Sequence, residues 1–210
     1  MQCMNSTLMN HIFTFFSYSV LAIGAENVIF ARGLGLSTGL RMINDPRKDT
    51  LYFCTALTFF QLVNSILAYF AVPLVYSSPL AYYARFITPV IIVACCAVSY
   101  IVVVLLLGIV LKRSTFKRIV YSLTGASINS AIVGTIILSL GRGFNFVETV
   151  GFGLGSSIGY MLAMLLVSEG ERKINHDMVP QHFRGLPITL IYISVLALAI
   201  FGLTGNTMAL

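Results

Sequence analysis

The chain has 210 residues, of which 58% are hydrophobic and 10% charged, and its mean hydropathy is +0.91. Soluble domains have roughly 25% charged residues, so this composition excludes an ordinary soluble protein and indicates a membrane protein. The net charge of +6 comes from 13 basic and 7 acidic residues. The basic residues flank apolar stretches instead of covering a folded face, which argues against nucleic-acid binding.

Six apolar stretches are long enough to cross the hydrocarbon core as helices, which takes about 20 residues. They cover roughly residues 12–32, 51–75, 86–111, 119–140, 149–168 and 187–204. These stretches are too long and too continuous for the alternating strands of a membrane β-barrel. We therefore expect an all-α integral membrane protein of six transmembrane helices, forming a single domain over residues 1–210.

Lysine and arginine gather in alternate connections between these stretches. The first, third and fifth connections hold Arg41, Arg47 and Lys48, then Lys112, Arg113, Lys117 and Arg118, then Arg172, Lys173 and Arg184, with Arg32 at the edge of the first. The second and fourth connections have only Arg85 and Arg142. Because positive loops stay in the cytoplasm, we expect both termini outside. The start, "MQCMNSTLMNH", has no basic residue, so we do not expect a cleaved signal peptide.

The basic segment "KRSTFKR", residues 112–118, divides the chain into two sets of three helices, about 12–111 and about 119–204. Each set opens with a helix interrupted by small and polar residues, "GAEN" at 24–27 and "GASINS" at 125–130. Because three is an odd number, the second set is inverted relative to the first. We expect two inverted three-helix repeats with interrupted first and fourth helices, which place a site near the middle of the membrane.

Three polar residues lie in these interruptions and form the candidate polar or ion site: Glu26, Asn27 and Asn129. Burying a carboxylate in the membrane costs roughly 2.5–3.5 kcal/mol. Glu26 therefore either faces a cavity or lies at the cytoplasmic interface with its charge offset by Arg32. The two asparagines either join helices by hydrogen bonds or act as ligands.

Small residues recur at every fourth position of the fifth stretch, "GFGLGSSIGYMLA". They are Gly151, Gly155, Gly159 and Ala163. Residues at this spacing lie along one side of a helix and let another backbone approach closely. We expect this glycine stripe to pack against a helix, either of this chain or of another subunit.

We predict no catalytic residue and no metal site. Cys54, Cys95 and Cys96 lie in apolar helices without C-x-x-C spacing, as small hydrophobic residues do. The polar stretch 168–187 contains His176 and His182 but no H-E-x-x-H pattern, so a solvated loop is the simpler interpretation.

Several segments resemble the membrane subunits of the Rnf-Nqr family. "MVPQHFRGLPITLI", residues 178–191, is similar to the family's signature before its last helix, and the Glu171-Arg172 pair upstream also resembles the family. "ENVIFARGLGLS" and "INSAIVG" are similar to its first and fourth helices. The basic odd-numbered connections look like the RnfA/NqrE type and unlike its oppositely oriented sister.

This resemblance implies a non-catalytic subunit of a complex in the bacterial cytoplasmic membrane. Such complexes pass electrons from ferredoxin or NADH to an acceptor and couple this to Na⁺ or H⁺ movement. The implied partners are a sister membrane subunit of opposite topology and subunits that carry flavin and iron–sulfur groups. In the family, each sister subunit supplies two cysteines to a shared [2Fe–2S] cluster.

At both positions that match the cluster cysteines, this chain has serine: Ser37 and Ser130. A serine hydroxyl is neither soft nor acidic enough to replace a thiolate on iron. We therefore expect no cofactor bound by this chain, unless Cys54, Cys95 or Cys96 substitutes from another helix.

Three functions are compatible with these observations. The first is a membrane subunit of an Rnf-type or Nqr-type electron-transport complex. The second is an ion or small-solute transporter that reuses the inverted repeat, with Glu26, Asn27 and Asn129 in its pathway. The third is a scaffold that assembles with a sister chain through the glycine stripe.

Overall fold

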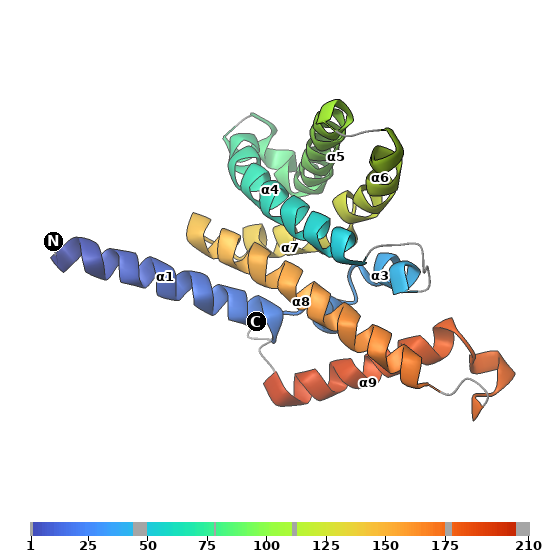
Figure 1. Cartoon of the computed structure of the whole chain (residues 1–210). Coiled ribbons are helices and arrows are strands. Elements are labelled where there is room, and N and C mark those ends of the chain that lie inside the picture. Colours follow the sequence, from blue (N-terminus) through green and yellow to red (C-terminus); the bar gives the residue numbers. More distant parts are fainter. Residues whose placement is uncertain (1, 44–49, 78, 111–112, 175–177, 205–210) are drawn as a thin grey trace.

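The computed structural model describes residues 2–43, 50–77, 79–110, 113–174 and 178–204. In these ranges the secondary-structure elements are all helices, joined by short turns (Figure 1). The longer helices are α1 (Gln2–Ile23), α4 (Thr50–Tyr76), α5 (Ala84–Val110), α6 (Arg113–Ser127), α7 (Ser130–Gly141), α8 (Phe146–Lys173) and α9 (Leu186–Thr204). The shorter elements are α2 (Val28–Arg32), α3 (Leu36–Ile43) and the 3₁₀ turns η1 (Pro79–Tyr83) and η3 (Gln181–Phe183).

Within the described ranges, five segments are long and apolar enough to cross a membrane: Tyr52–Tyr76, Ala81–Ile109, Leu123–Gly141, Phe146–Lys173 and Leu186–Thr204. A shorter apolar helix covers Leu8–Ile23. These segments confirm the prediction of a multi-pass helical membrane protein. The first predicted stretch, 12–32, is not one continuous helix, because α1 ends at Ile23 and the chain turns before α2 begins.

Both predicted interruptions are present. Residues 24–27 separate α1 from α2, and residues 128–129 separate α6 from α7. In each case the new helix begins directly after an asparagine, Asn27 or Asn129. Asparagine is among the preferred helix N-caps because its side-chain oxygen accepts hydrogen bonds from the first backbone N–H groups.

Helix α8 occupies the centre of the arrangement. In Figure 1, α4, α5 and α6 lie on one side of α8, α9 lies on the other, and α1 runs alongside it. The apolar core is formed mainly by α4, α7 and α8, with Phe53, Phe60, Ile132 and Tyr160 all buried. The two helix breaks therefore lie next to a well-packed core.

Some predictions concern residues outside the described ranges. They include the basic residues Arg47, Lys48 and Lys112 and the loop residue His176.

Candidate functional site

The first helix break is organised by the side chain of Asn27. Its oxygen accepts hydrogen bonds from the backbone N–H groups of Ile29 (3.1 Å) and Phe30 (3.4 Å). Its nitrogen donates to the carbonyl of Ile23 (3.0 Å), where α1 ends, and to that of Gly159 (2.9 Å) in α8. All four hydrogen bonds that an asparagine side chain commonly makes are thus used within the protein. Asn27 joins α1, α2 and α8, and these bonds leave it no free oxygen for a ligand.

The second break uses the same device with fewer bonds. The side-chain oxygen of Asn129 accepts a hydrogen bond from the Ala131 N–H (3.0 Å), and its nitrogen donates to the Tyr160 hydroxyl (3.5 Å). That hydroxyl donates to the carbonyl of Gly35 (2.9 Å), in the turn between α2 and α3. Asn129 and Tyr160 are both buried, so this chain of hydrogen bonds lies in the protein interior.

The two breaks meet at consecutive residues of α8. Asn27 binds Gly159, and Asn129 contacts Tyr160. Gly35 closes the junction: its φ is 77°, and an added Cβ would lie 2.6 Å from the Tyr160 ring and 2.8 Å from the Asn129 oxygen. A side chain there would be strained and obstructed, so this position requires glycine. The structure thus brings two segments of the candidate site together around the middle of α8.

The glycine stripe of α8 faces α1 within the same chain. Gly151, Gly155, Gly159 and Ala163 are all buried. A Cβ on Gly151 would lie 2.7 Å from the Phe15 carbonyl oxygen, and one on Gly155 would collide with the Ser19 backbone. Because Phe15 and Ser19 meet α8 in the same order along the chain, α1 and α8 run parallel (Figure 1).

The contact between α1 and α8 also answers the question of the stripe's partner. The Ser19 hydroxyl donates to the Gly151 carbonyl (2.9 Å), which adds a polar bond to the close backbone packing. The hypothesis of a scaffold that binds a sister chain through this stripe does not hold for these glycines, because α1 already covers them.

Glu26 is buried, with 7% of its surface exposed, and its carboxylate lies between two guanidinium groups. One oxygen pairs with Arg32 at 3.4 Å, and the other pairs with Arg142, which follows α7. The structure has the pairing with Arg32 that belongs to one interpretation of Glu26 and a cavity beside Glu26 that belongs to the other. One carboxylate and two guanidinium groups leave this cluster with a formal charge of +1.

The shared carboxylate corrects one prediction from the basic residues. The sequence assigned Arg32 to the edge of the first connection and Arg142 to the fourth, on opposite sides of the membrane. Both guanidinium groups bind Glu26, so they cannot lie at membrane faces about 30 Å apart. The reason is that α2 is only 5 residues long and does not carry Arg32 to the far side.

A pocket of about 520 Å³ lies between the first break, α2 and α9. Its polar lining comes from Glu26, Arg32, Ser194 and Thr204, and its apolar lining includes Phe30, Leu198 and Phe201. Pockets that hold small ligands have volumes of roughly 300–1,000 Å³. The pocket is large enough for a small solute or a hydrated ion, with one ion pair on its wall.

Ser37 and Ser130, at the positions of the family's cluster cysteines, lie at the same junction. Both are exposed on this chain. The Ser130 hydroxyl oxygen accepts a hydrogen bond from the Gly35 N–H (2.8 Å), two residues before Ser37. The structure therefore places the two matched segments next to each other, on a part of the surface that another subunit can reach.

The donors at this junction do not fit an iron–sulfur cluster. Clusters are held by cysteine thiolates, with histidine as the main substitute. The junction offers two hydroxyls, while Cys54 and Cys96 are buried in the core. Among the described residues, no three His, Cys, Asp or Glu side chains form a group that could hold a metal ion.

Two contributors to the site were missed in the sequence. In the sequence, Arg142 is only a charge in a loop, and Tyr160 is only one residue of the segment that contains the stripe. Nothing in the local pattern connects them with Glu26 or Asn129, which lie 116 and 31 positions away in the chain. A carboxylate buried in a membrane usually pairs with a cation, so Glu26 itself was the signal that an arginine such as Arg142 could lie beside it.

The fold and the two breaks define a multi-pass α-helical membrane protein with asparagine-capped interruptions in its first and fourth apolar segments. The chain belongs to the Rnf-Nqr family, described as "Rnf-Nqr subunit, membrane protein", whose sequence model matches residues 15–207.

Two relatives that align over nearly their full lengths agree with this family. The A-subunit of the ion-translocating oxidoreductase complex of Syntrophotalea carbinolica is 27% identical over 187 residues, which cover 88% of this chain and 93% of that protein. The A-subunit of the Na⁺-translocating ferredoxin:NAD⁺ oxidoreductase complex of Acetobacterium woodii is 25% identical over 190 residues, 89% of this chain and 94% of that protein.

A shorter match has higher identity. The E-subunit of the Na⁺-translocating NADH-quinone reductase of Chlamydia trachomatis is 35% identical over 105 residues, 48% of this chain. The chain spans 42% of the length of that relative, which is less than half.

Proposed function

We propose that this protein is a membrane subunit of an ion-translocating electron-transport complex of the Rnf or Nqr type. The observation that carries the proposal is the family match, which covers residues 15–207 and therefore both helix breaks. The two relatives aligned over nearly their full lengths are named as A-subunits of ion-translocating oxidoreductase complexes. The chain has no catalytic group of its own in this proposal and contributes structure to the complex.

The proposed architecture is a pair of inverted three-helix repeats, about 12–111 and about 119–204, with both termini outside the bacterial cytoplasmic membrane. The matched breaks support it, since each restarts a helix after an asparagine and both contact the middle of α8. The parallel run of α1 and α8, the first and fifth predicted spans, also supports it, because odd-numbered spans cross a membrane in the same direction.

The proposed partners are a sister subunit of opposite topology and subunits that carry flavin and iron–sulfur groups. The exposed junction at Ser37 and Ser130 is the surface at which we place the sister subunit. We further propose that this chain binds no cluster, because hydroxyls stand where thiolates are needed.

Purification of the tagged chain from its native membranes in a mild detergent tests the proposal. We expect flavin-bearing and iron-bearing subunits to copurify, together with ferredoxin-driven or NADH-driven ion uptake that is lost when the gene is deleted. A chain that purifies alone, with ion uptake unchanged in the deletion strain, would contradict the proposal.

A separate measurement tests the cofactor statement. The chain purified with its sister subunit should contain little iron, and the double variant Ser37→Cys/Ser130→Cys should contain more. Stoichiometric iron in the wild type, which persists when Cys54, Cys95 and Cys96 are replaced, would contradict the statement that serines at positions 37 and 130 prevent cluster binding.

The pocket beside Glu26 favours a second candidate, a transporter of an ion or small solute. This candidate predicts ion or solute flux in liposomes that contain this chain alone, and a loss of flux in Glu26→Gln. An electron-transport subunit predicts no flux without its partners. The liposome experiment therefore separates the two functions.

A further inference from the structure

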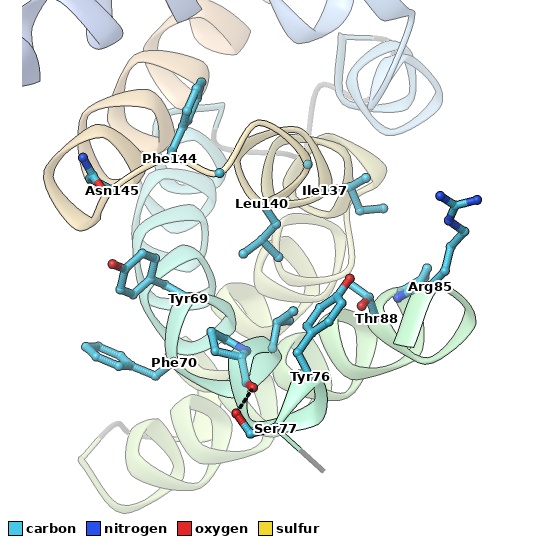
Figure 2. A pocket seen from close by; sticks show the side chains of 15 residues that line it. Tyr69, Phe70, Tyr76, Ser77, Arg85, Thr88, Ile137, Leu140, Phe144 and Asn145 are labelled. Atoms are coloured by element: carbon cyan, nitrogen blue, oxygen red, sulfur yellow. Dashed lines mark hydrogen bonds between the residues drawn. The ribbon is translucent and has the colours of Figure 1, made fainter. Parts of the chain in front are cut away.

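A second, larger pocket has no role in the proposed function. It has a volume of about 890 Å³ and lies where α4 and α7 end and where α5 and the segment leading into α8 begin (Figure 2). It is separate from the break residues Glu26, Asn27 and Asn129, none of which lines it.

The walls of this pocket are mainly apolar and aromatic. They include Phe70 and Pro73 of α4, Ile137 and Leu140 of α7, and Phe144. Figure 2 shows the Leu140 side chain pointing from α7 toward α4. Pockets of this size and lining commonly hold the apolar body of a ligand, with a few polar groups that fix its orientation.

Polar side chains lie on several sides of the pocket, but among the described lining residues only Arg85 is charged, and it lies at one margin. Arg85 and Thr88 of α5 line the pocket there, and in Figure 2 the Arg85 guanidinium points away from the aromatic wall. Arg85 is exposed, and it makes no ion pair with any carboxylate in the described part of the chain. A cation without a counter-ion at the rim of an apolar pocket suits a ligand with an anionic head and an apolar tail.

The position of the pocket indicates where that ligand comes from. α4 and α5 have 27 residues each, which makes them about 40 Å long. The hydrocarbon core is roughly 30 Å thick, so the ends of these helices reach the headgroup region. Tyrosine and arginine at helix ends are typical of this depth, and Tyr69, Tyr76 and Arg85 all line the pocket.

We propose that this pocket binds one anionic phospholipid, with an acyl chain between α4 and α7 and the phosphate at Arg85. A free phosphate would leave the apolar walls unfilled, and a neutral amphiphile would leave Arg85 without a counter-ion. The proposal requires only that the chain lies in a bilayer. It therefore stands or falls independently of the electron-transport function.

Lipid analysis of the purified complex tests this proposal. Phospholipids that remain after detergent exchange are identified and counted by native mass spectrometry, in the wild type and in Arg85→Gln, Arg85→Lys and Leu140→Trp. We expect about one retained anionic phospholipid per chain in the wild type and in Arg85→Lys. Because a charge-assisted hydrogen bond is lost, we expect about tenfold less in Arg85→Gln. Leu140→Trp should also lose the lipid, since the indole occupies its place.

Matched controls are Arg172→Gln, an exposed cation elsewhere, and Leu203→Trp, an exposed apolar residue elsewhere; both should retain the lipid. Titration of the delipidated complex provides a second measurement that does not depend on Leu140→Trp folding. Phosphatidylglycerol should raise the melting temperature more than phosphatidylcholine, and this difference should vanish in Arg85→Gln. Equal retention of anionic phospholipid in the wild type and in Arg85→Gln would overturn the proposal. So would a pocket that retains a neutral quinone in the wild type and in Arg85→Gln and loses it only in Leu140→Trp.

Discussion

The two helix breaks use the same asparagine cap but differ in length, charge and number of bonds. At the first break, Asn27 makes four hydrogen bonds, and the neighbouring Glu26 pairs with two arginines. At the second break, Asn129 makes two hydrogen bonds, and its neighbours are neutral. A single capping hydrogen bond, from the Ala131 N–H to Asn129, is therefore sufficient to begin α7 at the second break. Both breaks are attached to α8, and the extra bonds at the first break also join it to the end of α1 and to Arg142 after α7.

The largest effect is expected from a substitution that disrupts the packing of α1, which leads into the first break, against α8. In Gly155→Leu, the side chain would collide with the Ser19 backbone and separate α1 from α8. We expect a loss of at least about 3 kcal/mol, because backbone atoms cannot move aside as a side chain can. The yield of monodisperse protein, measured by fluorescence-detected size-exclusion chromatography of a tagged chain, should fall sharply.

Gly202→Leu is the matched control for this variant. Gly202 is exposed on α9, and no atom lies within 4 Å of an added Cβ. Its yield should equal that of the wild type. A normal yield for Gly155→Leu would show that α1 and α8 do not need to approach so closely.

A direct comparison of the two caps comes next in size. Asn27→Ala should cost about 2–3 kcal/mol, because it removes a cap and also leaves the buried Gly159 carbonyl without its partner. Asn129→Ala should cost about 1 kcal/mol, the usual value for a cap. Thermal unfolding can be followed with a thiol-reactive dye, since Cys54 and Cys96 are buried in the folded protein. Equal losses in the two variants would remove the distinction between the breaks.

The charge at the first break is tested by Glu26→Gln. This change leaves Arg32 and Arg142 without a carboxylate, and we expect a loss of about 1–2 kcal/mol. The loss is below that of a fully buried pair because the two arginine side chains are 41% and 37% exposed. In Glu169→Gln, the control, an exposed pair is removed and the same unfolding assay should show less than about 0.5 kcal/mol. If both variants have the melting temperature of the wild type, the ion pairs of Glu26 do not stabilise the first break.

The smallest effect is expected at the second break. Tyr160→Phe keeps the ring in the core but removes the hydroxyl that donates to Gly35 and accepts from Asn129. A loss of about 1 kcal/mol in the dye assay is expected. Asn129→Ala and Tyr160→Phe should not be additive, because both break the same bond. Full additivity in the double variant would mean that the two side chains act separately.

Much of the fold was accessible from the sequence because it depends on neighbours in the chain. Apolar stretches of sufficient length predicted the membrane helices, and Gly24 with Asn27 predicted the first break. The exception is the first stretch, where hydropathy extends to residue 32 but the helix ends at Ile23. Hydropathy averages over a window, so a short polar break does not interrupt it.

The candidate site was accessible only in part. Glu26, Asn27 and Asn129 stand out in the sequence as polar residues in apolar surroundings, but the sequence does not distinguish asparagines that act as ligands from asparagines that link helices. In the structure Asn27 makes four side-chain hydrogen bonds within the protein and Asn129 makes two. Arg142 and Tyr160 were missed because their importance comes from contacts with residues that are distant in the chain.

The amino-acid sequence alone determined that this protein lies in a membrane, that its fold is helical and where two of its helices break. Hydrophobic length and capping chemistry act over a few residues, so they can be read locally. Tertiary structure decided that α1 covers the glycine stripe, that Arg142 reaches Glu26 across 116 positions, and that both breaks meet at α8. These contacts depend on how whole helices pack, and no local pattern contains that information.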